Sequence, residues 1–207
     1  MKKLLLALTA IITFQISFGQ TPTIRDYFIP EAGKNEVSFY NSTMPEASRK
    51  IIYNDDDKGY QDISTYKGYV VGTNKYYIEI SPNEVNVIGV ENWSAVTTPA
   101  TTETSYDSNF ILKMPEPGKT ISWFYLDGNM KLKCTASWTT VTYNEERRKA
   151  IKLVQYYKRW NSTTVKYYVE GIGLWETDFV RKNPKTLKLE TLKFETFDGL
   201  DYSSPDQ

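Results

Sequence analysis

The sequence predicts a mainly β fold in which neighbouring strands run antiparallel. Tyrosine occurs 16 times, and threonine, valine, isoleucine and tryptophan also recur along the chain. These residue types suit the pleated, half-buried surface of a sheet. Apolar and polar residues alternate in short runs, which is the period of a strand. Most connections between the runs are short, and short connections favour antiparallel meanders over helical crossovers.

The alternation places strands along most of the chain after residue 33. The ranges are Lys34–Tyr40, Lys50–Tyr53, Gly68–Val71, Lys75–Ile80, Asn86–Trp93, Asn109–Met114, Ile121–Tyr125, Lys131–Tyr143, Arg147–Tyr157, Thr163–Glu170, Leu174–Val180 and Leu187–Phe197.

Turn residues punctuate these strands. "SPNE" at 81–84, "LDGN" at 126–129 and "YNEER" at 143–147 each predict a hairpin, and Asp-Gly is a strong hairpin signal. "MPEPGK" at 114–119 cannot lie inside a sheet because proline lacks the amide donor. The glycines of "EGIG" at 170–173 predict a tight turn, with a close approach to a ligand as the alternative.

Three other segments are expected to lie outside strands. "STMPEASRK" at 42–50 has a capping box and a proline in its first turn, so it predicts one short helix. The Thr-rich run at 97–109 predicts a long loop. "NDDDKGYQD" at 54–62 predicts a solvated turn, because Lys58 and Thr65 would stand at ligand positions of a calcium loop aligned on it.

The first 19 residues have the organisation of a secretory signal peptide. Two lysines precede an apolar core, and Ser17 and Gly19 supply the small residues that fit cleavage between Gly19 and Gln20. The core is shorter than the roughly 20 residues that a spanning helix needs, and Gln20 stands where a lipoprotein would carry cysteine. We therefore expect an exported periplasmic or extracellular protein without a lipid anchor or a transmembrane span, and with residues 20–207 as one β-rich domain.

Composition excludes several chemistries. The chain has no histidine and a single cysteine, Cys134, so histidine-based catalytic triads, four-cysteine zinc sites and intramolecular disulfides are absent. Without a concentrated basic face, nucleic acid is not an expected partner. The sequence predicts a non-enzymatic protein without a cofactor or metal, with a two-carboxylate hydrolase as the remote alternative. It does not indicate an oligomeric state.

Several motifs together resemble secreted proteins of unknown function from Bacteroidota. They are "DYFIPEAGKNEVSFY" (26–40), "MPEPGKTISWFY" (114–125), "CTASWTTVTYNEERRKAIKLVQYY" (134–157) and "KYYVEGIGLWETDF" (166–179). These proteins are similar to families whose fold resembles the periplasmic lipoprotein carrier. The resemblance implies a single-domain, strongly curved antiparallel sheet or open barrel with at most one or two short helices. It implies a fold more than an activity.

Two functions remain open on this reading. The first is binding of a lipid-like or other hydrophobic ligand in the groove of the curved sheet, and its candidate lining is Trp123, Trp138, Trp160, Trp175 and Tyr168. The alternative for each tryptophan is ordinary core packing. The second function is carbohydrate or protein binding by exposed aromatic side chains. It rests on tyrosine pairs such as Tyr167-Tyr168, which place one ring on each side of a strand.

Overall fold

The structure is a computed structural model that describes residues 21–31, 36–41, 44–94, 102–106, 108–127, 130–182, 186 and 189–201. The expected signal peptide and its cleavage point at Gly19 and Gln20 lie outside these residues. Within the described ranges, no helix is both long enough and apolar enough to span a bilayer.

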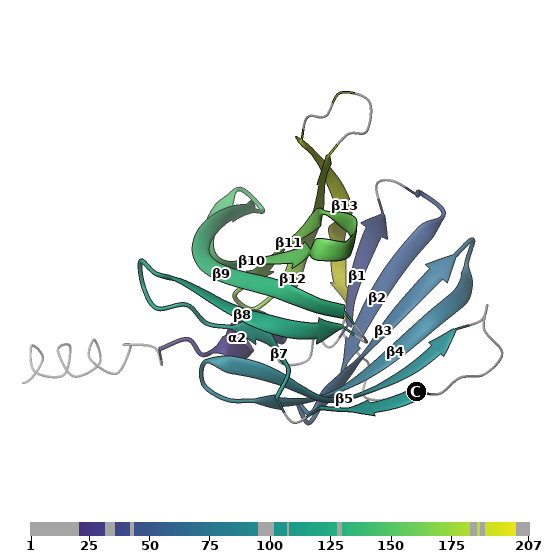
Figure 1. Ribbon diagram of the computed structural model, residues 1–207, viewed down its shortest axis with the longest axis horizontal. Coiled ribbons are helices and arrows are strands. Elements are labelled where there is room, and N and C mark those ends of the chain that lie inside the picture. Colours follow the sequence, from purple (N-terminus) through teal and green to yellow (C-terminus); the bar gives the residue numbers. More distant parts are fainter. Residues whose placement is uncertain are drawn as a thin grey trace, which may run out of the picture.

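The described strands form one curled antiparallel sheet, an open half-barrel (Figure 1). The strands are β1 (Glu36–Asn41), β2 (Ala47–Tyr53), β3 (Gly59–Tyr66), β4 (Tyr69–Ile80), β5 (Glu84–Ser94), β6 (Thr102–Ser105), β7 (Phe110–Lys113), β8 (Thr120–Asp127), β9 (Met130–Tyr143), β10 (Glu146–Tyr157), β11 (Ser162–Val169), β12 (Gly173–Lys182) and β13 (Leu189–Asp201). A helix, α2 (Ile24–Phe28), and a 3-10 turn, η1 (Lys158–Trp160), complete the described elements. The predicted fold class is confirmed.

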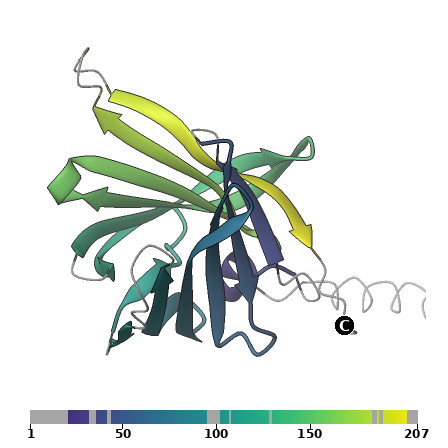
Figure 2. The same cartoon turned by 90° about the vertical axis from the view of Figure 1, so that its right-hand side faces the viewer.

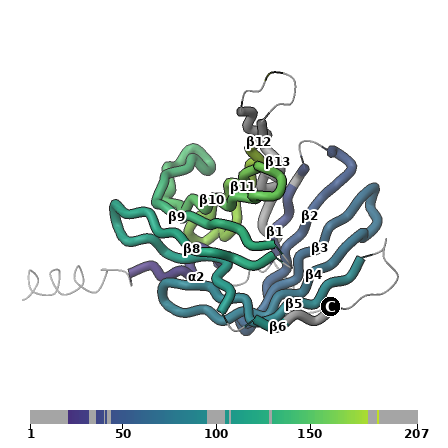
Figure 3. Tube along the Cα trace, viewed as in Figure 1, coloured from purple at the N-terminus to yellow at the C-terminus, as the bar shows by residue number. Residues whose placement is uncertain are grey.

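The sheet has two wings, each of which is a meander of consecutive strands. One wing runs from β1 to β6 and the other from β8 to β12. The last strand, β13, pairs with β12 on one side and with β1 on the other, where Glu36 faces Asp201. This pairing joins the wings (Figure 2). Figure 3 follows strands β2 to β5 of one wing and β8 to β11 of the other along the Cα trace.

Strand β7 bridges the remaining edges of the two wings. It pairs with β5 in a short ladder in which Val85 faces Leu112. Hydrogen bonds from side chains then link Asn109 and Phe110, at the start of β7, to strand β8. The Trp123 indole donates to the Phe110 carbonyl at 2.6 Å. The Asn109 carboxamide donates to the Leu126 carbonyl at 2.8 Å and accepts from the Leu126 amide at 2.7 Å. One side chain thus replaces a missing stretch of ladder.

Helix α2 plugs one end of the half-barrel. Its sequence "IRDYF" is too short to be stable alone, but Ile24, Tyr27 and Phe28 are all buried. The Phe28 ring stacks on Tyr168, with centroids 5.9 Å apart, and contacts Tyr60 edge-on. Thr23 caps the start of the helix, and its backbone amide donates to the Asp26 carboxylate at 2.7 Å. Packing of the aromatic face stabilises a helix that the sequence pattern does not reveal.

The glycines of the 170–173 turn combine a positive φ with a close approach. Gly171 and Gly173 have φ values of 73° and 79°. A Cβ on Gly173 would lie 3.0 Å from the Phe28 carbonyl oxygen. The Gly171 amide donates to the Asp26 carbonyl at 2.7 Å. The predicted turn is confirmed, and the atoms that approach it belong to the segment that carries α2.

The structure differs from the sequence-based expectations at four places. Residues 47–50 belong to β2 and not to a helix, because β2 pairs with both β1 and β3. Strand β3, absent from the expected set, follows the acidic turn at 54–57. The two strands expected at 68–80 are one strand, β4. Part of the expected loop at 97–109 forms β6, which pairs with β5. In each case the ladder with neighbouring strands outweighs local propensity.

Candidate functional site

The inner face of the half-barrel changes character from one end to the other. Near α2 it carries tyrosines, including Tyr53, Tyr60 and Tyr168, which are buried. Two residues further along each strand the same face carries Ile51, Asp62 and Lys166, because side chains on one face recur with a period of two. The end away from α2 is therefore more polar.

A solvent-open pocket of about 410 Å³ lies at this polar end, which we call the mouth pocket. Its volume is in the usual range for small-molecule sites. Its lining comes from β2, β8, β9, η1 and the three strands β10 to β12, and consists of Arg49, Asp127, Met130, Tyr157, Trp160, Ser162, Thr164, Lys166, Thr177 and Phe179. Antiparallel pairing brings these residues together from seven elements.

Arg49 is held at the pocket wall by Asp62. The guanidinium Nε donates to Asp62 Oδ1 at 2.7 Å and Nη2 donates to Oδ2 at 2.6 Å. Arg49 and Asp62 stand on adjacent strands, and both side chains are largely buried. The guanidinium also lies 5.8 Å from the centre of the Phe39 ring. This two-bond pair fixes the arginine and offsets most of its charge.

Two hydroxyl groups in the lining lack a hydrogen-bond partner among the described residues. They are Ser162 Oγ and Thr177 Oγ1, on residues that are 2% and 3% exposed. Lys166 faces Thr177 across the β11–β12 pair, and Ser162 lies four residues further along the same face of β11. Buried hydroxyls without partners are unusual, and both residues belong to the lining of the mouth pocket although the oxygens themselves are covered.

Aromatic and thioether groups form the rest of the wall. Tyr157 stacks on Trp160 with centroids 5.6 Å apart, and Trp160 is 56% exposed. Burial raises the pKa of Tyr157, and a hydrogen bond with Thr164 acts in the opposite direction. A second hollow of about 530 Å³ shares Met130 and Tyr157 with the mouth pocket. It adds Lys131, Leu132, Lys158 and Arg159 to the rim.

Of the five residues predicted to bind a ligand, Trp160 alone lines the mouth pocket. The Trp123 indole closes the seam with β7, and the Trp138 indole donates to the Pro115 carbonyl at 2.8 Å. Tyr168 is 3% exposed under Phe28. Trp175 packs beside a small separate cluster of Val141, Ala150, Val169 and Ile172. Sequence reasoning missed Ser162, Lys166 and Thr177.

The tyrosine pairs do divide between the two faces of their strands. Tyr76 stacks inside on Tyr60 with centroids 4.6 Å apart, whereas Tyr77 lines a groove on the outside. Tyr168 is buried inside, and Tyr167 packs against the outer cluster. The strand at 162–169 is buried on both faces and is not half-buried, since Val165 and Val169 are also covered.

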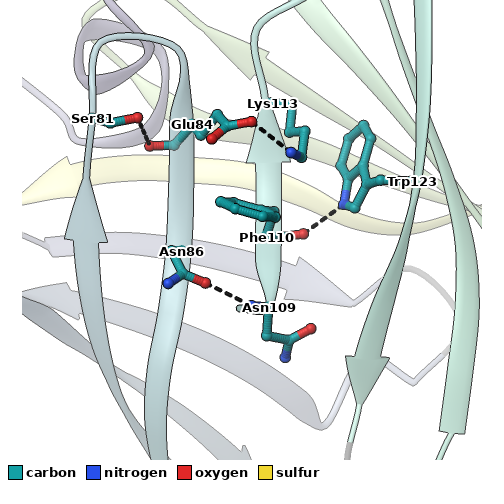
Figure 4. A network of polar contacts seen from close by, with 7 residues as sticks. All are labelled: Ser81, Glu84, Asn86, Asn109, Phe110, Lys113 and Trp123. Carbon is teal, nitrogen blue, oxygen red and sulfur yellow. Dashed lines mark hydrogen bonds and ion pairs between the residues drawn. The ribbon is translucent and has the colours of Figure 1, made fainter. Parts of the chain in front are cut away.

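The outer groove is a broad, shallow surface of about 1150 Å³ between the start of α2 and the β4–β5 hairpin. Ion pairs within the chain engage several of its charges. Arg25 contacts Asp57 at 2.5 Å, and Glu84 contacts Lys113 at 2.5 Å. Figure 4 shows the latter pair beside the Phe110 ring and the bond from Trp123. In the same view the Asn109 amide donates to Asn86 Oδ1 at 2.6 Å.

The single thiol lies inside the sheet and away from both hollows. Cys134 is fully buried, and burial raises its pKa to about 11. Gln155 Nε2 lies 3.9 Å from its sulfur, and Gln155 Oε1 has no partner among the described residues. A buried thiol with a raised pKa is a poor nucleophile. In the described part of the chain, no three acidic or cysteine side chains gather as a metal site.

No family model, curated protein or solved structure matches the chain. The fold and the site therefore define the protein only by class. It is a mainly β protein built on one open antiparallel half-barrel, with a helix at one end of the inner face and a partly apolar pocket at the other.

Proposed function

We propose that the half-barrel is a non-enzymatic binding protein for a lipid-like or other hydrophobic ligand, which it holds in the mouth pocket. The observation that carries this proposal is the wall of Met130, Tyr157, Trp160 and Phe179 around an open cavity. Removing apolar surface from water is favourable by about 25 cal/mol per Å². The water-exposed surface of Tyr157 and Trp160 does not gain this free energy. A ligand that covers the pair recovers part of it.

Export to the periplasm or the extracellular space belongs to the same proposal. It rests on the sequence of residues 1–19 and not on the described structure. Export of the expressed full chain is checked by the N-terminal sequence of the secreted product, which should begin at Gln20. A product that retains Met1 in the cytoplasm would contradict it.

The first test is displacement of a neutral fluorescent probe, N-phenyl-1-naphthylamine, from the purified protein. We expect Trp160→Ala to weaken probe binding at least fivefold, because the variant removes one wall of the pocket. Trp93→Ala is the matched control, since Trp93 is 39% exposed on β5 and does not line the pocket. Equal binding by both variants would place the probe elsewhere and contradict the proposal.

The second test asks whether the protein carries its ligand through purification. An organic extract of the protein, analysed by mass spectrometry, should contain the same amphiphile in independent preparations. The Trp160→Ala protein should carry less of it. An extract in which the amphiphile content is unchanged by the substitution would count against the mouth pocket.

The outer groove favours a second candidate, recognition of a carbohydrate or protein by aromatic side chains. Tyr77 and Phe110 line this groove together with several carboxylates, and aromatic faces with nearby acids suit sugar rings. Glycan-array binding that is lost in Tyr77→Ala and retained in Trp160→Ala would favour this function over the mouth pocket.

A further inference from the structure

We infer that the outer face of strands β8, β9 and β10 docks on the surface of an anionic lipid bilayer. The docking surface, which we call the basic aromatic patch, consists of Phe124, Leu126, Lys131, Lys133 and Tyr156. Along each strand these residues alternate with more buried residues of the inner face. The inference goes beyond the proposed function, because it does not require a ligand in the mouth pocket.

Strand pairing gathers the five side chains into two neighbouring rows. Lys133 stands opposite Phe124 on one side and Tyr156 on the other. In the next row Lys131 stands opposite Leu126, and its Nζ lies 4.4 Å from the centre of the Phe124 ring. Residues that face each other across a strand pair project from the same side of the sheet. Apolar groups and ammonium groups are therefore interleaved on one surface.

The apolar members of the patch are open to water. Phe124 is 59% exposed, Leu126 is 41% exposed and Tyr156 is 37% exposed. Single exposed apolar side chains are ordinary on a protein surface, whereas clusters of them mark sites of interaction. The partner of the patch should therefore offer apolar surface as well as a charge that matches the lysines.

Charge at this end of the sheet favours an anionic partner. Strand β9 carries Lys131 and Lys133, and η1 adds Lys158 and Arg159, all of which are exposed. Among the described residues, none of these four side chains forms an ion pair. Asp127 is the one acidic residue within β8, β9 and η1. Clustered charge of one sign attracts surfaces of the opposite sign.

The residue types favour a bilayer over an acidic protein as this partner. Lysine is depleted at protein–protein interfaces, whereas lysines beside aromatic residues are typical of proteins that lie on a bilayer. In that setting the ammonium groups reach the lipid phosphates, and the rings enter the boundary between head groups and acyl chains. The basic aromatic patch supplies both kinds of contact from adjacent strands.

Docking in this way would bring the opening of the mouth pocket to the bilayer. Lys131 lines a hollow with Lys158 and Arg159, and this hollow shares Met130 and Tyr157 with the mouth pocket. The basic surface is therefore continuous round the end of the sheet. A lipid-like ligand would then enter the pocket from the membrane without crossing bulk water.

The first test measures flotation of the purified protein with vesicles of phosphatidylglycerol and phosphatidylcholine, and with vesicles of phosphatidylcholine alone. We expect binding to the anionic vesicles to be tighter by roughly tenfold or more, and to weaken as sodium chloride screens the charges. Lys131→Gln and Lys133→Gln should each weaken it by roughly fivefold, the effect of one basic side chain near an anionic membrane. Phe124→Ala should also weaken it, because the ring no longer enters the boundary layer.

Matched controls come from the other wing of the sheet. Lys58→Gln removes a charge from an exposed position in the turn before β3, and Tyr69→Ala removes a ring that is 77% exposed at the start of β4. Neither change should affect vesicle binding. All of the substituted side chains are exposed, so each variant should keep the circular dichroism spectrum and the urea midpoint of the original protein.

A second test asks whether the rings enter the bilayer. Phe124→Trp places a fluorescent reporter in the basic aromatic patch, and Tyr69→Trp places one in the other wing. Anionic vesicles with brominated acyl chains should quench the emission added by Phe124→Trp and leave the emission added by Tyr69→Trp unchanged.

The possible results separate this inference from the proposed function. Equal binding to both kinds of vesicle, or equal losses in the patch variants and their controls, would overturn the docking surface. Charge-dependent binding without quenching of Phe124→Trp would overturn insertion into a bilayer and favour an acidic protein as the partner. Displacement of the naphthylamine probe from the mouth pocket is measured without vesicles, so failure of the pocket to bind the probe would leave the docking surface standing.

Discussion

At the scale of single residues, the turn between β11 and β12 shows how glycine couples two segments of the chain. Gly173 has a left-handed φ of 79°, and the Phe28 carbonyl oxygen lies where a Cβ would approach within 3.0 Å. A side chain at this position would meet backbone atoms, which cannot rotate away. The packing of α2 on the sheet therefore depends on the absence of a side chain at Gly173.

We expect Gly173→Ala to lower the free energy of unfolding by roughly 2 to 4 kcal/mol, because strained φ and a backbone clash add together. Gly68→Ala is the matched control. Gly68 has the same φ of 79° but no atom within 4 Å of its would-be Cβ, so we expect a cost of about 1 kcal/mol. Urea unfolding of both variants measures the difference, and equal costs would show that the contact with Phe28 is unimportant.

The thiol of Cys134 provides a second prediction at this scale. Because burial raises its pKa to about 11, the folded protein at pH 8 holds almost no thiolate. A disulfide reagent such as 5,5′-dithiobis(2-nitrobenzoate) should react fully in 6 M guanidinium chloride and only slowly in buffer. Rapid reaction of the folded protein would contradict the burial of this side chain.

At the scale of elements, the seam between β7 and β8 rests on side chains in place of a ladder. Asn109 is 1% exposed. Its carboxamide donates to the Leu126 carbonyl and accepts from the Leu126 amide. Trp123 adds the bond to Phe110. The seam is therefore more sensitive to single substitutions than the ladder-paired strands are.

We expect Asn109→Ala to cost roughly 1 to 3 kcal/mol, since it removes two hydrogen bonds to the Leu126 backbone, each worth about 0.5 to 1.5 kcal/mol. Asn109→Asp tests the two bonds separately, because a carboxylate accepts from the Leu126 amide but cannot donate to the Leu126 carbonyl. Asn109→Asp should therefore also lower the free energy of unfolding. Hydrogen exchange should show faster exchange of the Leu126 amide in Asn109→Ala, and unchanged exchange would contradict this account of the seam.

The elements also show what sequence patterns can and cannot predict. The hairpins at 81–84, 126–129 and 143–147 were predictable because their turn residues and flanking alternation agree, and paired strands flank each of them. Helix α2 was not, since five residues are too few for a helical period. Strand β3 has polar residues on its inner face, Asp62 and Ser64, so its pattern did not stand out as a strand.

The candidate site was less predictable than the fold for a related reason. Ser162, Lys166 and Thr177 are ordinary polar residues on two strands, and only the pairing of β11 with β12 places Thr177 opposite Lys166. The large aromatic residues were the visible candidates, but Trp123 and Trp138 have their indole N–H groups bonded to backbone carbonyls. A tryptophan in a sequence does not show which of these roles it has.

At the scale of the whole molecule, the buried tyrosines set the response to alkaline pH. Burial raises the pKa of Tyr53, Tyr60, Tyr76, Tyr125 and Tyr168 above the ordinary value of 10.0. The unfolded chain loses these protons near pH 10, whereas the folded protein retains them to higher pH. The stabilisation is therefore present in full below about pH 10 and is lost as the pH rises beyond it.

We expect the urea midpoint to stay nearly constant from pH 7 to 9 and to fall steeply above pH 10. Each retained proton contributes up to about 1.4 kcal/mol per pH unit to this slope. Tyr53→Phe should reduce the dependence of the unfolding free energy on pH by the contribution of one proton. Tyr69→Phe should leave it unchanged because Tyr69 is 77% exposed. Tyrosinate absorbance at 295 nm during the titration supplies the check, and a gradual rise without unfolding would contradict the prediction.

The pairing of β1 with β13 has a consequence for the order in which the molecule folds. The strands from β1 to β6 can pair with their neighbours as they emerge during synthesis, and so can those from β8 to β12. The two meanders are joined through a strand that ends at Asp201, so a contact between the ends of the chain has to form late and across a long loop. Until then β1 and β13 each present an unpaired edge, and the time spent in that state decides how exposed the nascent chain is to aggregation.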